Sequence, residues 1–321
     1  MCSAEPSMEK LEELGSVPKW VHWLRTEAEQ EEREMLELAQ RELARSLPEG
    51  VAAEVPKWRF TLRLVSGSHA IRGKPLAAWN KHVEHIKLAP AGRDHRELVV
   101  TVTLPKRVSV SALYGVGLAL ATDLVLAFNI GTNGLFWWHL GVPAHASRFY
   151  EQMRDLETNA GLVVERTPAL RINWGNVALS DHELAAVARC FGAMRRANPA
   201  IHEALQHYRL GVALLVKTDI FLQFEPNSFE EFYTAVKLTL KATGEWDGSS
   251  PVRDAVLAFI ARTSATALVE ADDLLGKTEL IDAGRMADLR ADLTDVGMMK
   301  LLADAVLLRA LVAPPSASAP A

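Results

Sequence analysis

The sequence has only two cysteines, Cys2 and Cys190, among its 321 residues. Two thiols cannot build a disulfide framework in a chain of this length, so cysteine usage favours a reducing compartment and we expect a cytoplasmic protein. The opening segment, MCSAEPSMEKLEEL, is acidic and lacks an apolar h-region. We therefore expect no secretory signal.

Short motifs that identify common enzymes are also missing. The sequence contains no GxxxxGK followed by Ser or Thr, no GxGxxG, no GxSxG, no HExxH and no CxxC. These absences exclude the standard phosphate loop, dinucleotide fold, nucleophile elbow, zinc protease and dithiol motifs. We predict no cofactor and no metal site, and no reaction can be named from a motif.

Histidine spacing leaves a zinc site as an alternative. His82 and His85 are three residues apart, and His139 and His145 are six apart. On the strand predicted for this region, residues three apart point to opposite faces of a sheet. No cysteine or carboxylate cluster completes a ligand set with usable spacing.

Charge is distributed unevenly along the chain. Residues 1–56 carry thirteen acidic and six basic side chains, a net charge of −7. Residues 57–107 carry eleven basic and three acidic side chains, a net charge of +8, although the whole chain is at −5. The acidic segment includes a predicted helix over residues 8–46, and 314–321 is predicted to be a disordered tail.

The pattern of the basic segment predicts β-strands with one polar face. Trp58, Phe60, Leu62 and Leu64 alternate with polar residues, which predicts a strand. Further strands are predicted over 83–88 and 98–104, joined by the loop PAGRDHR. Phosphate contacts are a natural use of clustered Lys and Arg side chains. The candidate ligand-binding residues are Arg59, Arg63, Lys74, Lys81 and Lys87.

An alternative explanation of the basic segment is internal compensation. The acidic N-terminal helix could lie against the basic sheet and neutralise it. Surface ion pairs of this kind contribute little each. The sequence leaves open whether 57–107 is an exposed patch or a covered one.

Residues 108–140 form the longest apolar stretch of the sequence. Asp123 is the only charged residue between Arg107 and Asn129. We predict a helix from Ser109 or Ser111 to about Phe128, buried at the centre of the fold, with Asp123 paired or at its edge. The alternative is a membrane-associated protein that inserts 108–128, since about 20 apolar residues span a bilayer.

Residues from Ser180 onward read as helices. Ser180 with Glu183, and Ser228 with Glu231, are spaced as capping boxes, and Pro199 and Pro251 mark two further helix starts. Helices are also predicted over 148–158 and over 272–312, and short strands over 162–165 and 170–173.

One spacing at the junction of two predicted helices has a parallel in a known family. Arg196 is followed by five residues and then His202. This is similar to the Arg-x4–6-His signature of HEPN-type helical RNases, and the resemblance covers at most residues 180–268. It implies a dimer in which His202 aids proton transfer and Arg196 stabilises phosphate charge. The family usually has a polar residue after the arginine, whereas this chain has Ala197.

Together these patterns predict an α+β, mostly helical protein. A small antiparallel sheet and a central buried apolar helix precede an all-helical half. The predicted segments are an acidic helix at 1–56, a basic α+β domain at 57–178, a helical domain at 179–313 and the tail. We expect an intracellular binding or scaffold protein without chemistry of its own. Its anionic partner would be RNA, a phosphate-bearing ligand or an acidic protein surface.

Overall fold

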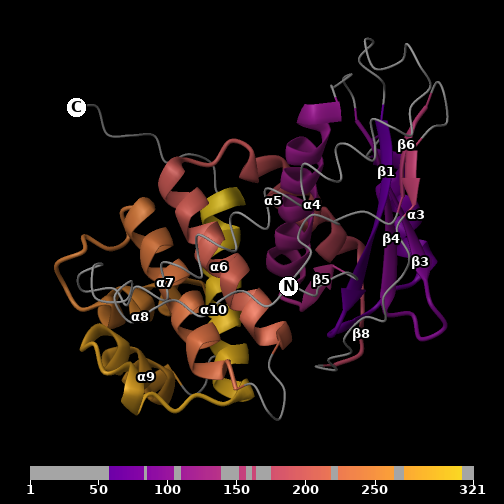
Figure 1. The fold of residues 1–321 in the computed structure, drawn as a ribbon. Helices are drawn as coiled ribbons and strands as arrows, with labels where there is room; N and C mark the ends of the chain where they lie inside the picture. Colours follow the sequence, from indigo (N-terminus) through magenta and orange to yellow (C-terminus); the bar gives the residue numbers. More distant parts are fainter. Residues whose placement is uncertain are drawn as a thin grey trace, which may run out of the picture. The chain divides into compact units, whose positions relative to one another are not determined.

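The computed structural model describes residues 58–82, 85–104, 110–138, 152–156, 161–163, 175–217, 223–263 and 271–312. Over these ranges the fold is α+β and mostly helical, which confirms the predicted class (Figure 1). The predicted helix over 8–46, the strand over 170–173 and the C-terminal tail lie outside them. The chain divides into two compact units. The boundaries of the four predicted segments stay predictions.

The two units are interleaved along the sequence. The first takes Met1–Leu62, Thr101–Ala119 and Leu140–Pro168. The second takes Arg63–Val100, Leu120–His139 and Ala169–Ala321.

The main sheet has six strands. Its order is β3 (Ile86–Ala91), β4 (Glu97–Thr103), β1 (Trp58–Ser66), β6 (Gln152–Asp155) and β7 (Gly161–Val163), and β5 (Phe136–Trp138) also pairs with β1. The pairings of β1 with β5, β1 with β6 and β6 with β7 are antiparallel. A second, parallel pair joins β2 (His69–Ala70) to β8 (Val177–Ala178).

Strand β1 follows the alternation that its sequence predicts. Trp58, Phe60 and Leu62 are fully buried, whereas Arg59 is exposed and Thr61 is half-buried. The strand predicted over 98–104 is confirmed as β4, and its side chains show the same alternation. One face of these strands is therefore apolar core, and the opposite face carries the polar side chains.

Two predictions for the α+β half are wrong. Residues 152–155, predicted as part of a helix, form β6, because their backbone pairs with β1 from Trp58↔Asp155 to Thr61↔Gln152. Tertiary pairing here overrides local helical pattern.

The helix α3 (Gly73–His82) was not predicted, and the strand expected from residue 83 begins only at Ile86. Trp79 fixes this turn of chain by donating its indole N–H to the Ile86 carbonyl, 3.1 Å away.

The apolar stretch forms α4 (Val110–Thr132), which is longer than predicted. Asn129 does not end the helix. Its buried amide donates to the Phe136 carbonyl at 2.7 Å and accepts the Phe136 N–H at 3.1 Å, so it satisfies the backbone at the start of β5. The helix ends instead at Thr132, and the next residue, Asn133, has a left-handed φ of 50°. Among the residues that the structure describes, no helix has both the length and the apolar character needed to cross a membrane.

The remaining helices belong to the second unit. They are α5 (Asp181–Met194), α6 (Pro199–Lys217), α7 (Glu225–Ala242), α8 (Val252–Thr263), α9 (Ala271–Asp282) and α10 (Leu293–Val312), with a 3-10 turn at Met286–Asp288. Helix α7 packs on α6 and α10, and α10 also packs on α5 (Figure 1). The predicted capping box of Ser180 and Glu183 is confirmed.

The second predicted capping box is wrong. Helix α7 begins at Glu225, with a proline in its first turn, so Ser228 lies inside the helix. Its buried hydroxyl donates to the Gly211 carbonyl of α6, 2.8 Å away. A Cβ on Gly211 would stand 2.9 Å from the Phe232 ring, and this glycine is what allows α6 and α7 to approach so closely.

Candidate functional site

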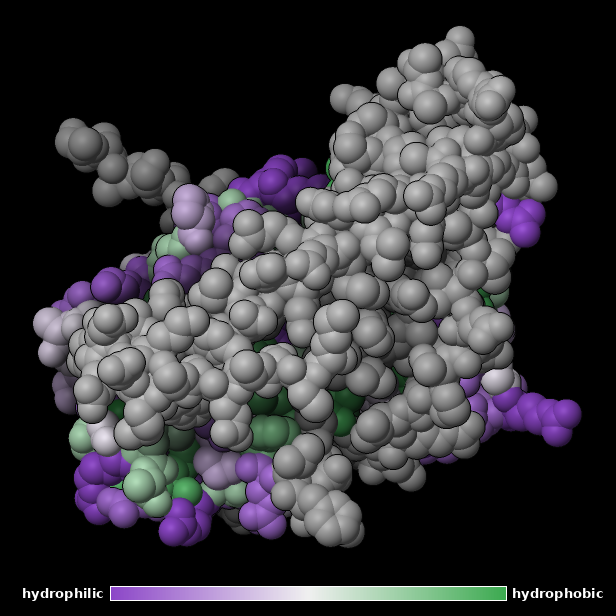
Figure 2. Space-filling model, in the orientation of Figure 1, coloured by the Kyte–Doolittle hydropathy of each residue, from purple (hydrophilic) through white to green (hydrophobic). Residues whose placement is uncertain are grey.

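The basic residues predicted to bind a ligand differ in their exposure and in the compact unit to which they belong. Arg59, Lys74 and Lys87 are exposed on β1, α3 and β3 respectively. Lys81 lies on α3, and its side chain is outside the described set. Figure 2 shows hydrophilic residues projecting at the right-hand edge, where Figure 1 places the connection between β3 and β4.

Two of the predicted residues make contacts within the protein. Arg63 forms an ion pair with Glu97 of β4, with Nη1 2.6 Å from Oε2, and its side chain is only 10% exposed. Lys87 donates from Nζ to the Asn80 carbonyl at 2.5 Å, in the last turn of α3. A lysine at a helix C-terminus stabilises the unpaired carbonyls there. Glu97, which belongs to the same basic segment, therefore neutralises Arg63, whereas the acidic N-terminal helix of the alternative explanation lies outside the described residues.

Arg59 has a different environment, created by the strand that sequence reasoning missed. In the register of β1 with β6, Arg59 stands directly opposite Arg154. On its other side, its Nε donates to the Thr103 hydroxyl of β4, 3.4 Å away. Side chains directly opposite on neighbouring strands share one face, with Cβ atoms roughly 4.5–5.5 Å apart. The side chains of Arg59, Arg154 and Thr103 therefore lie on the same polar face of the first unit.

The RNase-like pair lies where the sequence predicts, at a helix junction. Arg196 follows the C-terminal end of α5, and His202 is in the first turn of α6, whose start is capped by Asn198. Both side chains are exposed. Asp123 of α4 is half-buried, and burial raises the pKa of its carboxyl, while Arg195 and His202 lower it. Asp123 thus has Arg195 and His202 as neighbours, as expected for a carboxyl on a largely buried helix.

A buried polar network that the sequence did not reveal links α6 and α10. Lys300 donates from Nζ to Asp304 at 2.7 Å, and both side chains are almost fully buried at 1% and 0% exposed. The Tyr208 hydroxyl donates to the other oxygen of Asp304. Burial lowers the pKa of Lys300 and raises that of Asp304.

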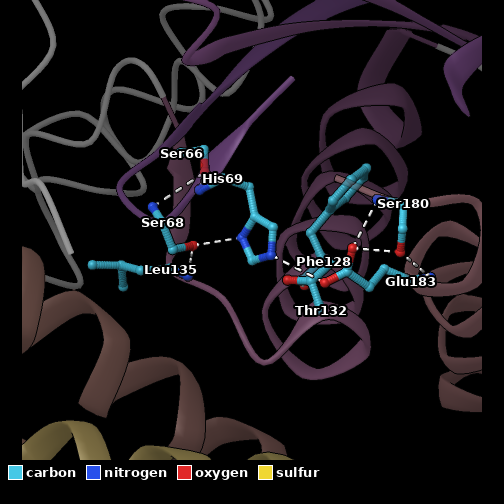
Figure 3. Close-up of polar contacts among 8 residues, drawn as sticks. All are labelled: Ser66, Ser68, His69, Phe128, Thr132, Leu135, Ser180 and Glu183. Atoms are coloured by element: carbon cyan, nitrogen blue, oxygen red, sulfur yellow. Dashed lines mark hydrogen bonds and ion pairs between the residues drawn. The ribbon is translucent and has the colours of Figure 1, made fainter. Parts of the chain in front are cut away.

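A second missed arrangement joins β2 to α5 through three side chains (Figure 3). The Ser68 hydroxyl lies 2.7 Å from Nδ1 of His69, and Nε2 of His69 lies 3.1 Å from Oε1 of Glu183. Glu183 also accepts the N–H and the hydroxyl of Ser180, so the capping box of α5 holds this carboxylate in place. We call Ser68, His69 and Glu183 the relay.

The imidazole of the relay is held tightly. His69 is 4% exposed, and its ring stacks on Phe136 with a centroid distance of 5.6 Å. Gly134 lies against the His69 ring as well, because a Cβ on this residue would come within 2.7 Å of the ring. The Ser66 hydroxyl accepts the backbone N–H groups of Ser68 and His69 at 3.3 and 2.8 Å, and it fixes the turn that leads into β2.

The pKa shifts of His69 and Glu183 indicate which atoms of the relay carry protons. Burial lowers the pKa of His69, and so do Lys300 and Arg96, although Glu183 opposes them. Hydrogen bonds from Ser180 and the contact with His69 lower the pKa of Glu183 against the effect of burial. At neutral pH the imidazole is therefore neutral and the carboxylate is ionised. Nε2 carries the hydrogen that faces Glu183, and Nδ1 accepts the hydrogen of Ser68.

Neither a search for metal sites nor comparison with known proteins points to a function. Within the described ranges, no group of three or more His, Cys, Asp or Glu side chains is arranged to hold a metal ion. In comparisons with known proteins, no family model, no curated protein and no solved structure matches the chain.

Proposed function

We propose that the protein binds a phosphate-bearing ligand on the polar face of its sheet, between Arg59 and Arg154. The observation that carries this proposal is the β1–β6 register, which sets the two arginines directly opposite each other. An anion bound at this position would accept charge-assisted hydrogen bonds from both guanidinium groups.

Guanidinium groups suit this ligand better than other cations do. An arginine presents a planar fork of N–H donors that matches two phosphate oxygens, and such charge-assisted hydrogen bonds are short and strong. The Thr103 hydroxyl, already 3.4 Å from Arg59 Nε, adds a neutral donor beside them. Arg59 is exposed, so a ligand can reach it from solvent.

The same face favours a phosphate group over an unpaired nucleic-acid base. Sheets that read single-stranded RNA stack its bases on aromatic side chains. In this sheet Trp58 and Phe60 point into the core. Along β1 and β4 as described, the opposite face carries Arg, Thr, Glu and Val side chains, none of them aromatic.

Titration calorimetry with pyrophosphate tests the proposal. Arg59→Gln and Arg154→Gln should each weaken binding by about 1.5–3 kcal/mol, since each removes a charged hydrogen-bond donor, which is roughly 10- to 150-fold in Kd. Arg93→Gln is the matched control, because Arg93 is an exposed arginine in the β3–β4 connection and its loss changes the net charge equally. Its affinity should stay within about twofold of the wild type.

Three outcomes would overturn the proposal. Wild-type protein that does not bind pyrophosphate lacks the site. Equal losses in all three variants indicate a general charge effect. Binding of a short RNA without binding of pyrophosphate would replace the phosphate site with a nucleic-acid interface.

A helical RNase is a second candidate function. Arg196 and His202 are both exposed at one helix junction, and His202 is near enough to Asp123 to lower its pKa. An RNase of this kind would lose its cleavage activity in His202→Ala. Cleavage of a fluorogenic RNA that persists in this variant excludes the assignment.

A further inference from the structure

The relay has the connectivity of an activated serine, and it is separate from the proposed phosphate site. A hydroxyl becomes a strong nucleophile when a neighbouring base takes its proton and a third group orients that base. Ser68, His69 and Glu183 meet these distances at 2.7 and 3.1 Å. All three residues belong to the second compact unit, whereas Arg59 and Arg154 belong to the first.

The roles of the two ring nitrogens follow from what each one faces. Nε2 faces the carboxylate of Glu183, so it carries the ring hydrogen. Nδ1 is left with a lone pair, which is directed at the Ser68 hydroxyl. The ring has little room to turn, because it is buried, stacks on Phe136 and lies too close to Gly134 to leave space for a Cβ there. A base held in one tautomer and one orientation is pre-organised for proton transfer.

We propose that Ser68 is a nucleophile that accepts an acyl group from an activated carboxylic ester, with His69 as its base and Glu183 as the orienting carboxylate. As Ser68 Oγ bonds to the acyl carbon, its proton moves to His69 Nδ1. The imidazolium returns that proton to the leaving alkoxide as the ester C–O bond breaks. Water then attacks the acyl-serine by the same route, which releases the carboxylic acid and restores the hydroxyl.

A backbone donor stands ready for the negative charge that forms during the attack. The Leu135 N–H donates to Ser68 Oγ at 2.8 Å (Figure 3). The oxyanion develops on the carbonyl oxygen of the acyl group, whose carbon bonds to this Oγ, so the Leu135 N–H lies beside the place where that charge forms. The N–H groups of Ser68 and His69 are taken by Ser66. With one such donor, the site suits activated esters better than amides, whose cleavage needs greater oxyanion stabilisation.

Covalent labelling with a fluorophosphonate probe tests this proposal on the full-length protein. The probe loses fluoride when an activated serine bonds to its phosphorus, and mass spectrometry of the digested protein identifies the labelled residue. We expect the label on Ser68 and its loss in Ser68→Ala. His69→Gln should label roughly 10²- to 10⁴-fold more slowly, which is the usual contribution of a general base.

Ser249→Ala is the matched control. In the wild type, the exposed Ser249 donates its hydroxyl to the Asp247 carboxylate at 2.6 Å. Among the described residues, no imidazole bonds to this hydroxyl. Labelling and hydrolysis of p-nitrophenyl acetate should be unchanged in this variant. Because mapping of the label on the wild type needs no variant, the test remains decisive even if a substitution in the relay prevents folding.

The pH dependence provides an independent readout. Glu183 raises the pKa of His69, but burial, Lys300 and Arg96 lower it to below its usual 6.5. Labelling requires neutral His69, so its rate should rise with pH, reach half of its maximum below pH 6.5 and be flat above. The proposal is wrong if folded wild-type protein is not labelled, if the label maps to another residue or if Ser68→Ala is labelled at the wild-type rate. In these cases the relay only ties β2 to α5.

Discussion

The buried pair of Lys300 and Asp304 allows a sharp test of how charge is tolerated in the helical core. Asp304→Asn keeps the size of the side chain and leaves an oxygen that can still accept the Tyr208 hydroxyl. It removes the only charge that the structure shows against Lys300, whose side chain is 1% exposed. Breaking a buried ion pair from one side typically costs about 3–5 kcal/mol, because the remaining ion is desolvated without compensation.

The chain contains a matched exposed pair for comparison. Lys277 and Asp273 are also a lysine and an aspartate four residues apart on one helix, with the same kind of contact at 2.6 Å. Asp273 is 73% exposed, however, and Lys277 has a second partner in Asp295. Asp273→Asn should therefore cost less than about 1 kcal/mol.

Urea unfolding of four proteins measures the difference. The single variants Asp304→Asn and Asp273→Asn are compared with wild type and with the double variant Lys300→Met/Asp304→Asn. The double variant should recover most of the loss, because an uncharged pair of similar volume carries no desolvation cost. Equal losses for Asp304→Asn and Asp273→Asn, or a double variant as unstable as the single one, would refute this reasoning.

Two further predictions concern the surroundings of the relay. Gly134→Ala should destabilise the protein by about 1–3 kcal/mol in urea unfolding, because its Cβ would lie within 2.7 Å of the His69 ring and of the Thr132 hydroxyl. Gly276→Ala in α9, where nothing lies within 4 Å, should instead stabilise by about 0.4–1 kcal/mol, and a loss there would contradict the reasoning. Because the folded-state pKa of His69 is lowered, the native protein binds this proton less readily than the unfolded chain, so stability should fall as pH drops below 6.5. His69→Gln should remove this part of the dependence of stability on pH. An unchanged pH dependence in this variant would exclude His69 as its source.

Local patterns predicted the parts of the fold whose signal is local. The alternation of Trp58, Phe60 and Leu62 depends only on the two-residue period of a strand, and the structure confirms it. The capping box of Ser180 and Glu183 is likewise a contact within one turn of helix. Patterns of this kind need no knowledge of the rest of the molecule.

The errors arose where partners distant in sequence decide the structure. Residues 152–155 are a strand because β1, about ninety residues earlier, supplies their hydrogen bonds. Ser228 resembled a helix cap, but its hydroxyl bonds to Gly211 of the neighbouring helix instead. Neither fact leaves a mark in the local spacing.

The candidate sites were hidden for the same reason. His69 and Glu183 are 114 residues apart, and no motif connects them. The sequence singled out Arg59 correctly as an exposed polar-face residue, but Arg154 was assigned to a helix and could not be placed opposite it. The one visible hint was the adjacency of Ser68 and His69 between two predicted elements.

The interleaving of the two compact units bears on how the chain folds as it is synthesised. The first unit draws its last segment from Leu140–Pro168, so a ribosome must pass that point before the unit can close. By then the segments Arg63–Val100 and Leu120–His139 have already been made, but they belong to the second unit and must wait for Ala169–Ala321. Domains usually fold one after another from the N-terminus during translation. In this protein two stretches that include half of β1, β5 and most of α4 are made before Ala169–Ala321, which completes their unit, so they cannot finish packing as they emerge.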